Sequence, residues 1–111
     1  MKIHEQLQGA VTVLRPEGPL IESDAGLLKQ RLLQTLASSL GRFVVDMSSI
    51  PYLDSKGLEA LVEVTEEMGR SGQALRMCGA NKTVREVLEL TDLALLFEHF
   101  QDANTAVRSF L

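Results

Sequence analysis

The sequence predicts an α/β fold, in which a mixed, mostly parallel β-sheet begins with an N-terminal hairpin and carries about four helices. Two observations support this. Strand-like and helix-periodic segments alternate in the order ββαβαβα(β)α, and such alternation is typical of parallel sheets with crossover helices. The strand candidates after the hairpin are short unbroken apolar runs, which suit strands buried on both faces. At 111 residues the chain is expected to form a single domain, residues 1–111.

The chain opens with two predicted strands. Residues 3–7 alternate weakly between apolar and polar, and residues 11–15 are rich in β-forming residues. The turn between them, Gln8–Gly9–Ala10, is short. Because a parallel pair needs a long crossover, these strands must form an antiparallel hairpin.

The first helix is predicted after a break at Glu17–Gly18–Pro19. Ser23 or Asp24 is a plausible N-cap, and the helix should fade near Ser38–Ser39 with Gly41 as its stop signal. Its apolar stripe recurs every three or four residues: Ala25, Leu28, Leu32, Leu33 and Leu36.

A central strand over residues 43–45 comes next, and a polar, proline-containing loop over residues 46–54 follows it. The second helix should span Ser55 to Arg70 and end at Gly69 or Gly72. Its predicted inner face consists of Leu58, Leu61, Val62, Thr65 and Met68.

The C-terminal third contains a buried strand over residues 74–78 and a third helix capped by Asn81. The apolar side of that helix is Val84, Val87 and Leu88. We expect Leu95–Leu96–Phe97 to be a short last strand. A closing helix over residues 102–111 should make its contacts through Ala106, Val107 and Phe110.

The composition excludes several classes of function. A net charge of −4, with scattered basic residues, argues against nucleic acid and anionic membrane surfaces as partners. No apolar run approaches the roughly 20 residues that span a bilayer, so no membrane insertion is expected. The N-terminus turns polar at once and does not resemble a signal peptide, which favours a cytoplasmic protein. The single cysteine, Cys78, allows no internal disulfide and is interpreted as a small buried hydrophobe.

The most informative segment is the loop before the second helix. Asp54 and Ser55 are both good N-cap residues, and Gly57 would let the first helical turn lie close to the sheet. Ordinary capping explains this much without any function. A Ser55 hydroxyl at a helix N-terminus, beside the carboxyl edge of the sheet, is also open to partners and to phosphorylation.

The same segment resembles the signature of STAS domains, which occur in anti-sigma factor antagonists, stressosome proteins and some anion transporters. The resemblance rests on Val44–Ser48, on Ile50–Ser55 followed by Gly57–Leu58, on Gly18–Pro19–Leu20 and on residues 84–97. It implies that Ser55 is phosphorylated by a partner that is both anti-sigma factor and serine kinase, and that a phosphatase resets it. Partner binding is then expected at Leu53, Asp54, Ser55, Lys56 and Gly57.

Two residues depart from that family pattern. Lys56 stands where a small Ser, Thr or Ala is usual, and Ile21 stands where many relatives place Asp. Lys56 could pair with a phosphate on Ser55 or with an acidic partner group, or be an exposed lysine of no consequence.

Functions other than a phosphorylation switch are also compared with the sequence. His4 and His99 belong to no catalytic constellation, and no phosphate loop, metal site or cofactor motif is found, so an enzyme is not expected. A STAS subunit of a transporter or of a stress-signalling complex, without phosphorylation, is the alternative function. The acidic residues Glu59, Glu63, Glu66 and Glu67 indicate a solvated helix face or, alternatively, a contact for a basic partner. Whether the chain forms a homodimer is left open.

Overall fold

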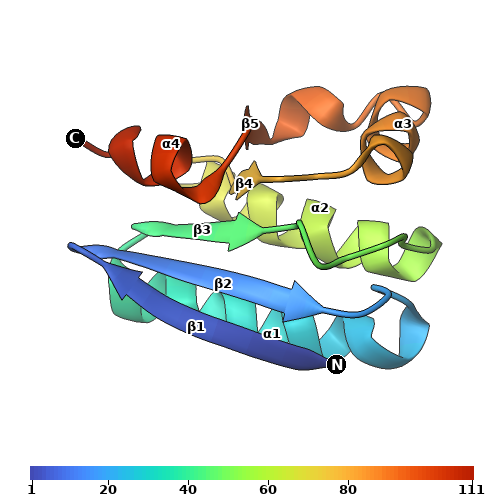
Figure 1. The fold of residues 1–111 in the computed structure, drawn as a ribbon, viewed down its shortest axis with the longest axis horizontal. Helices are drawn as coiled ribbons and strands as arrows, with labels where there is room; N and C mark the ends of the chain where they lie inside the picture. Colours follow the sequence, from blue (N-terminus) through green and yellow to red (C-terminus); the bar gives the residue numbers. More distant parts are fainter.

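The computed structural model describes residues 1–111, whose strands and helices follow the predicted order (Figure 1). In chain order the elements are β1 Lys2–Gln8, β2 Val11–Glu17, α1 Glu22–Ser39, β3 Phe43–Asp46, α2 Ser55–Gly69, β4 Arg76–Cys78, α3 Lys82–Leu90, the 3-10 turn η1 Ala94–Leu96, β5 Glu98–Phe100 and α4 Ala103–Arg108.

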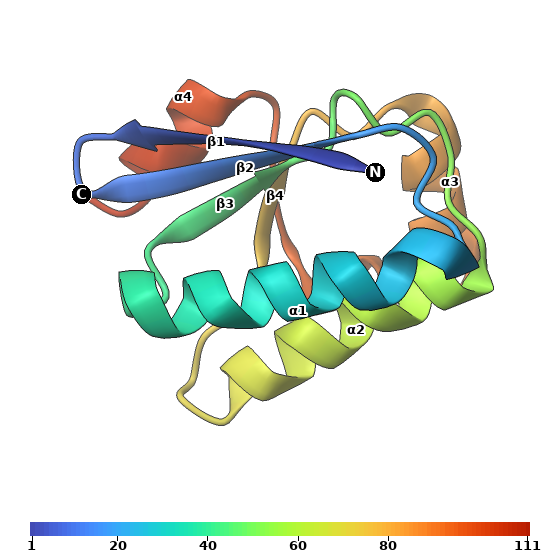
Figure 2. The ribbon, with the colours of Figure 1, turned by 90° about the horizontal axis from the view of Figure 1, so that it is seen from below.

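The sheet has the strand order β1-β2-β3-β4-β5. The first pair is antiparallel and the other three pairs are parallel, which confirms the predicted hairpin and the mixed sheet. Each crossover steps one strand in the same direction. Because such crossovers are right-handed, they place α1 and α2 on the same face, and α4 lies on the other (Figure 2).

β3 lies at the centre of the sheet and is buried on both faces, as its unbroken apolar run predicts. Phe43 and Val45 point into the larger core under α1 and α2. Val44 points the other way and packs in a small cluster with Val11, Cys78 and Ala106 beneath α4. Burying each such side chain contributes on the order of 1.5–3 kcal/mol to stability.

The start of α1 differs from the prediction. The N-cap is Ile21, whose side chain makes no capping hydrogen bond, and neither Ser23 nor Asp24 caps the helix. Asp24 instead accepts a hydrogen bond of 3.1 Å from the N-terminal amine of Met1. The backbone amide of Glu22 is satisfied from another element, so a local sequence rule could not find its partner.

The end of α1 follows the prediction with one addition. The helix ends at Ser39, and both Leu40 and Gly41 then adopt positive φ values, 55° and 84°. Their amides hydrogen-bond back to the Leu36 carbonyl and so satisfy the last turn. Leu40 is 81% exposed in this conformation, which L-residues adopt rarely.

The predicted last strand was wrong in position. Residues 94–96 form η1, and β5 comes after it at Glu98–Phe100. Leu95 is 98% exposed, so the apolar pair that suggested a strand is not in the core. The strand itself lies at the edge of the sheet and carries polar residues, which leaves little signal in its sequence.

The inner face of α2 is nearly as expected, except that Val64 is buried and Val62 only half-buried. Thr65 is the buried polar residue of this face. Its hydroxyl accepts a hydrogen bond from the Leu75 amide at 3.0 Å and donates one to the Leu96 carbonyl at 2.8 Å. A single side chain thereby links α2, the approach to β4 and η1.

Candidate functional site

The loop between β3 and α2, residues 47–54, lies beyond the carboxyl end of the central strand. It is held by backbone hydrogen bonds on one side: Gly18 donates to Ser49, and Leu20 donates to Tyr52, both at 3.0 Å. On the other side the Asn81 amide donates to the carbonyls of Ile50 and Pro51. The loop is therefore an ordered part of the fold between the starts of α1 and α3.

Asp54 is the N-cap of α2, which decides between the two capping residues that the sequence offered. One carboxylate oxygen accepts a hydrogen bond from the Gly57 amide at 2.8 Å. The other accepts from the Glu22 amide, the first residue of α1, at 2.9 Å. One carboxylate thus caps two helices that are far apart in sequence. Lacking a side-chain cap of its own, α1 depends on this contact.

The electrostatics of Asp54 follow from these contacts. The Gly57 amide, with smaller contributions from the amides of Glu22 and Lys56, holds the pKa of the Asp54 carboxyl below its usual range. Hydrogen bonds to the charged form of a carboxyl favour that form. The loop therefore carries a fixed negative charge at the N-termini of two helices.

Gly57 is required by the close approach of α2 to residue 20. An added Cβ would lie 2.3 Å from the Leu20 carbonyl oxygen and 2.8 Å from its Cγ. Leu20 in turn forms a parallel bridge with Leu53, and its carbonyl accepts from the Asp54 amide at 3.1 Å. The sequence suggested close packing here, and the partner is this bridge at the entrance to α1.

Ser55 is the first residue of α2 and is exposed. The next residue, Lys56, is exposed as well, and its ammonium lies 3.6 Å from the Glu59 carboxylate on the following turn. Leu53 is 9% exposed and packs in the core. Of the five predicted partner-binding residues, Ser55 and Lys56 present their side chains to solvent, whereas Leu53 and Gly57 shape the loop. A partner-binding role for these residues stays a prediction.

Sequence reasoning did not single out Tyr52, and it noted Ile21 only as a departure from the family pattern. Tyr52 is 49% exposed on the same loop, beside the Leu53 bridge. Ile21 is half-buried at the start of α1, where Asp54 caps the adjacent amide. An exposed aromatic residue in a proline-containing loop is the signal that could have identified Tyr52.

Other candidate residues lie elsewhere in structural roles. Cys78 is buried, as predicted; burial, with the nearby Asp46 carboxylate, raises the pKa of its thiol to about 12. The His4 ring lies 2.6 Å from Glu17, and the His99 ring lies 2.6 Å from the Ala94 carbonyl. No three His, Cys, Asp or Glu side chains gather as metal ligands.

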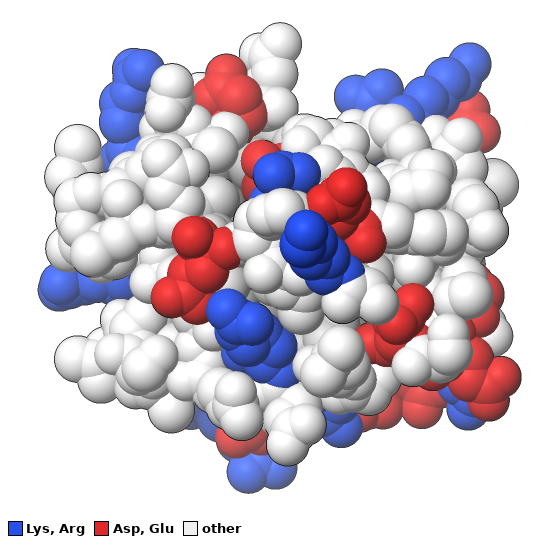
Figure 3. Space-filling view, turned by 60° about the horizontal axis from the view of Figure 1, so that its bottom comes forward, with Lys and Arg blue, Asp and Glu red and all other residues white.

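Two surface properties bear on partners. Acidic and basic side chains are interspersed over the face shown in Figure 3, with no continuous basic area there. None of the helices combines the length and apolar character needed to cross a bilayer.

Comparison with known proteins decides the family. The family model described as "STAS domain" matches residues 2–106, which is nearly the whole chain. The chain belongs to the STAS domain family. The strand order and helix placement derived above are therefore those of a STAS domain, as the sequence motif predicted.

Solved structures agree on the fold. A candidate anti-sigma factor antagonist of Thermotoga maritima matches this STAS domain with a TM-score of 0.86 at 21% identity, covering 96% of this chain and 92% of that one. The unphosphorylated form of the Bacillus anti-sigma factor antagonist SpoIIAA matches with a TM-score of 0.73 at 14% identity, covering 98% and 96%.

The same fold also occurs within a larger protein. The murine anion transporter Solute Carrier 26 family member A9 matches with a TM-score of 0.74 at 15% identity, covering 95% of this chain and 18% of the transporter. At these identities the likenesses establish a common fold.

Proposed function

We propose that this STAS domain is an anti-sigma factor antagonist, a protein-binding switch that sequesters an anti-sigma factor with serine kinase activity and is inactivated by phosphorylation of Ser55. The observation that carries the proposal is the position of Ser55. It is exposed at the first residue of α2 and directly follows Asp54, the carboxylate that joins the starts of α1 and α2.

The chemistry of that position suits a reversible charge switch. A phosphate on Ser55 would add about −1.5 to −2 charge at pH 7. The partial positive charge of the helix N-terminus favours an anion there, so α2 need not melt. The fixed charge of Asp54 beside it would repel the phosphate, and the docking surface would change in charge without a change of fold.

The relatives support this reading. Structures of SpoIIAA exist in unphosphorylated and phosphorylated forms, so this fold accommodates a phosphate in that protein. By analogy, the partners of this chain would be an anti-sigma factor with kinase activity and a phosphatase. The chain itself would act without catalysis, in a bacterial cytoplasm.

The alternative function keeps the fold and omits the switch. The match to a domain of an anion transporter favours a STAS subunit of a transporter or of a stress-signalling complex. In that role Lys56 would be an ordinary surface residue and Ser55 would remain unmodified.

Incubation of the purified chain with ATP and a candidate serine kinase encoded nearby separates the two functions. We expect one phosphate on wild type, mapped to Ser55 by mass spectrometry, and none on Ser55→Ala. Ser71→Ala is the matched control, because Ser71 is exposed beyond the opposite end of α2. Unmodified wild type that copurifies with a transporter ATPase would favour the alternative.

A further inference from the structure

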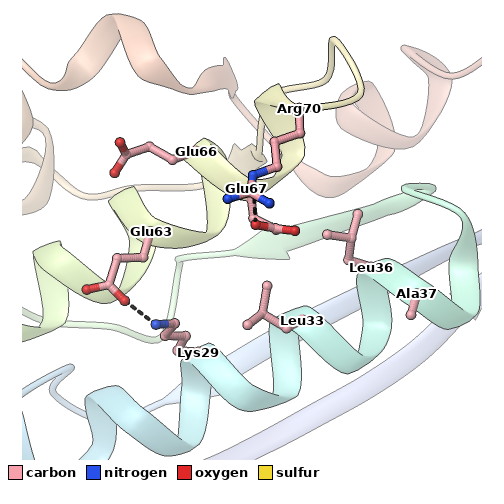
Figure 4. Close-up of a pocket in the computed structure, with 8 residues that line it drawn as sticks. All are labelled: Lys29, Leu33, Leu36, Ala37, Glu63, Glu66, Glu67 and Arg70. Atoms are coloured by element: carbon pink, nitrogen blue, oxygen red, sulfur yellow. Dashed lines mark hydrogen bonds and ion pairs between the residues drawn. The ribbon is translucent and has the colours of Figure 1, made fainter.

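A groove between α1 and α2 lies on the helical face of the domain, away from Ser55. It encloses about 720 Å³. α1 contributes Lys29, Leu33, Leu36 and Ala37 to its lining, and α2 contributes Glu63, Glu66, Glu67 and Arg70. In Figure 4, Leu33 and Leu36 point from α1 toward the space between the helices. The groove therefore has an aliphatic wall facing an acidic one.

The aliphatic wall lies on one flank of α1. Leu36 and Ala37 follow Leu33 by three and four residues and share that flank, and Leu40 comes at the C-cap just beyond the helix. Leu33 and Leu36 are only partly buried, and Leu40 is 81% exposed. This flank therefore exposes apolar surface that the core of the domain does not bury.

The charges of the groove leave carboxylates in excess. Lys29 pairs with Glu63 across the groove, and Arg70 pairs with Glu67 on its own helix at 3.4 Å. Glu66 has no ion-pair partner and extends from α2 away from α1 (Figure 4). Arg70 is 80% exposed, and such surface pairs are weak, so Glu67 can exchange its partner.

We propose that the α1–α2 groove binds an amphipathic segment of a partner protein that presents lysine or arginine beside aliphatic side chains. The aliphatic side chains of the segment pack on Leu33, Leu36 and Ala37. Its cations bind Glu66 and Glu67. An amphipathic helix in an apolar groove is a common mode of peptide recognition, and opposite charges at the rim select the partner and its orientation.

A second copy of this chain is a poorer occupant. In a symmetric contact both copies present the same surface, and the carboxylates of this surface outnumber its cations, so the contact would join two surfaces of like net charge. The chain also carries a net charge of −4, which disfavours self-association through an acidic surface.

The groove is separate from the proposed phosphorylation site. Glu66 lies eleven residues after Ser55 on the same helix, which corresponds to about 16 Å along its axis. A partner could therefore occupy the groove while the Ser55 loop is free or modified. The proposal stands whether or not Ser55 is a switch.

The probe for this site is a synthetic helical peptide of about 15 residues with leucine and lysine on adjacent flanks, long enough to span the groove. Titration into the ¹⁵N-labelled full chain should shift the amide signals of Leu33, Leu36, Ala37 and Glu67. A peptide with glutamate in place of lysine should bind at least about tenfold more weakly. Equal binding of the two peptides, or shifts centred elsewhere, would overturn the proposal.

Two variant pairs make the test specific. Ala37→Arg fills part of the groove and repels a cationic segment, and Gln34→Arg adds the same charge to an exposed position outside the groove. Only the first should weaken binding, by about tenfold. Glu66→Lys should weaken binding several-fold, whereas Glu89→Lys on α3 should not. Indistinguishable affinities within either pair would contradict the groove as the site.

Analytical ultracentrifugation tests whether a second copy of the chain occupies the groove, because it measures the oligomeric state. Wild type should remain monomeric at the concentrations used. A wild-type dimer that Ala37→Arg dissociates would assign the groove to a second copy of the chain and overturn the partner assignment.

Discussion

The Asp54 carboxylate accepts a hydrogen bond of 2.9 Å from the backbone amide of Glu22, thirty-two residues earlier in the chain. The same carboxylate caps its own helix through Gly57. A single side chain therefore caps the two helix starts beside Ser55, in addition to the backbone bonds that join Leu20 to the loop.

Replacement of Asp54 by Ala should lower the melting temperature by about 5 °C or more, since both α1 and α2 lose a cap. Asp102→Ala is the control, because Asp102 caps only the short α4 through Thr105. Circular dichroism melts of both variants measure the effect. A smaller loss for Asp54→Ala than for Asp102→Ala would show that the shared cap does not stabilise the two long helices.

Stability should decrease when the pH falls below about 4. The amides of Gly57 and Thr105 are the main cause of lowered pKa values for Asp54 and Asp102, respectively. A carboxyl with a lowered folded-state pKa contributes stability that is present above its ordinary pKa. That contribution is lost as the pH falls through the folded-state value. Thermal melts between pH 7 and acid should show this loss, and it should be smaller in Asp54→Asn. Identical pH profiles for wild type and Asp54→Asn would show that Asp54 does not contribute to the loss of stability in acid.

Gly57→Ala should destabilise the domain by about 1–3 kcal/mol, because the new methyl group would overlap the Leu20 carbonyl. Gly26→Ala in α1 is the matched control. Its added Cβ would meet no atom within 4 Å, so the better helix propensity of Ala should stabilise by up to about 1 kcal/mol. Urea unfolding measures both free energies of unfolding. The same sign of change for the two glycines would be incompatible with the close contact at Leu20.

Thr65→Val should cost about 1–3 kcal/mol, because it leaves the buried Leu75 amide without an acceptor. Thr35→Val makes the same substitution at an equally buried position on α1. There the hydroxyl only donates to the Arg31 carbonyl one turn earlier, and the change should cost less than about 1 kcal/mol. Denaturant unfolding measures the free energy of unfolding of both variants. Comparable losses of stability in the two would argue against the bridging role of Thr65.

Ser55→Asp should leave the melting temperature nearly unchanged and weaken binding to the kinase partner by about tenfold or more. Ser55 is exposed, so its replacement should not disturb the core, and an acidic residue suits the first turn of a helix. Calorimetric titration of wild type, Ser55→Asp and Ser55→Ala measures the affinities. If all three bind equally, the switch is not at this residue.

Much of the fold was predictable because it follows from local patterns. The apolar run at residues 43–45 identified the central strand, and Asn81 was recognised as the cap of α3 from its position alone. The last strand was placed too early, because Leu95 and Leu96 look like strand residues, whereas edge strand β5 begins with the polar residues Glu98 and His99. Whether such a segment forms a strand depends on which of its side chains are buried in the folded protein. A short stretch of sequence does not show which side chains those are.

The sequence by itself determined the order of elements, the hairpin, the STAS motif and the residues Asp54, Ser55 and Gly57 as the centre of interest. Those features depend on neighbours within one or two turns of chain. Only the tertiary structure decided that Asp54, and neither Ser23 nor Asp24, satisfies the first amide of α1, and that Gly57 is needed against Leu20. It also decided where α1 and α2 leave a groove. These contacts join residues more than thirty positions apart, and their existence depends on how the sheet brings two crossover helices side by side.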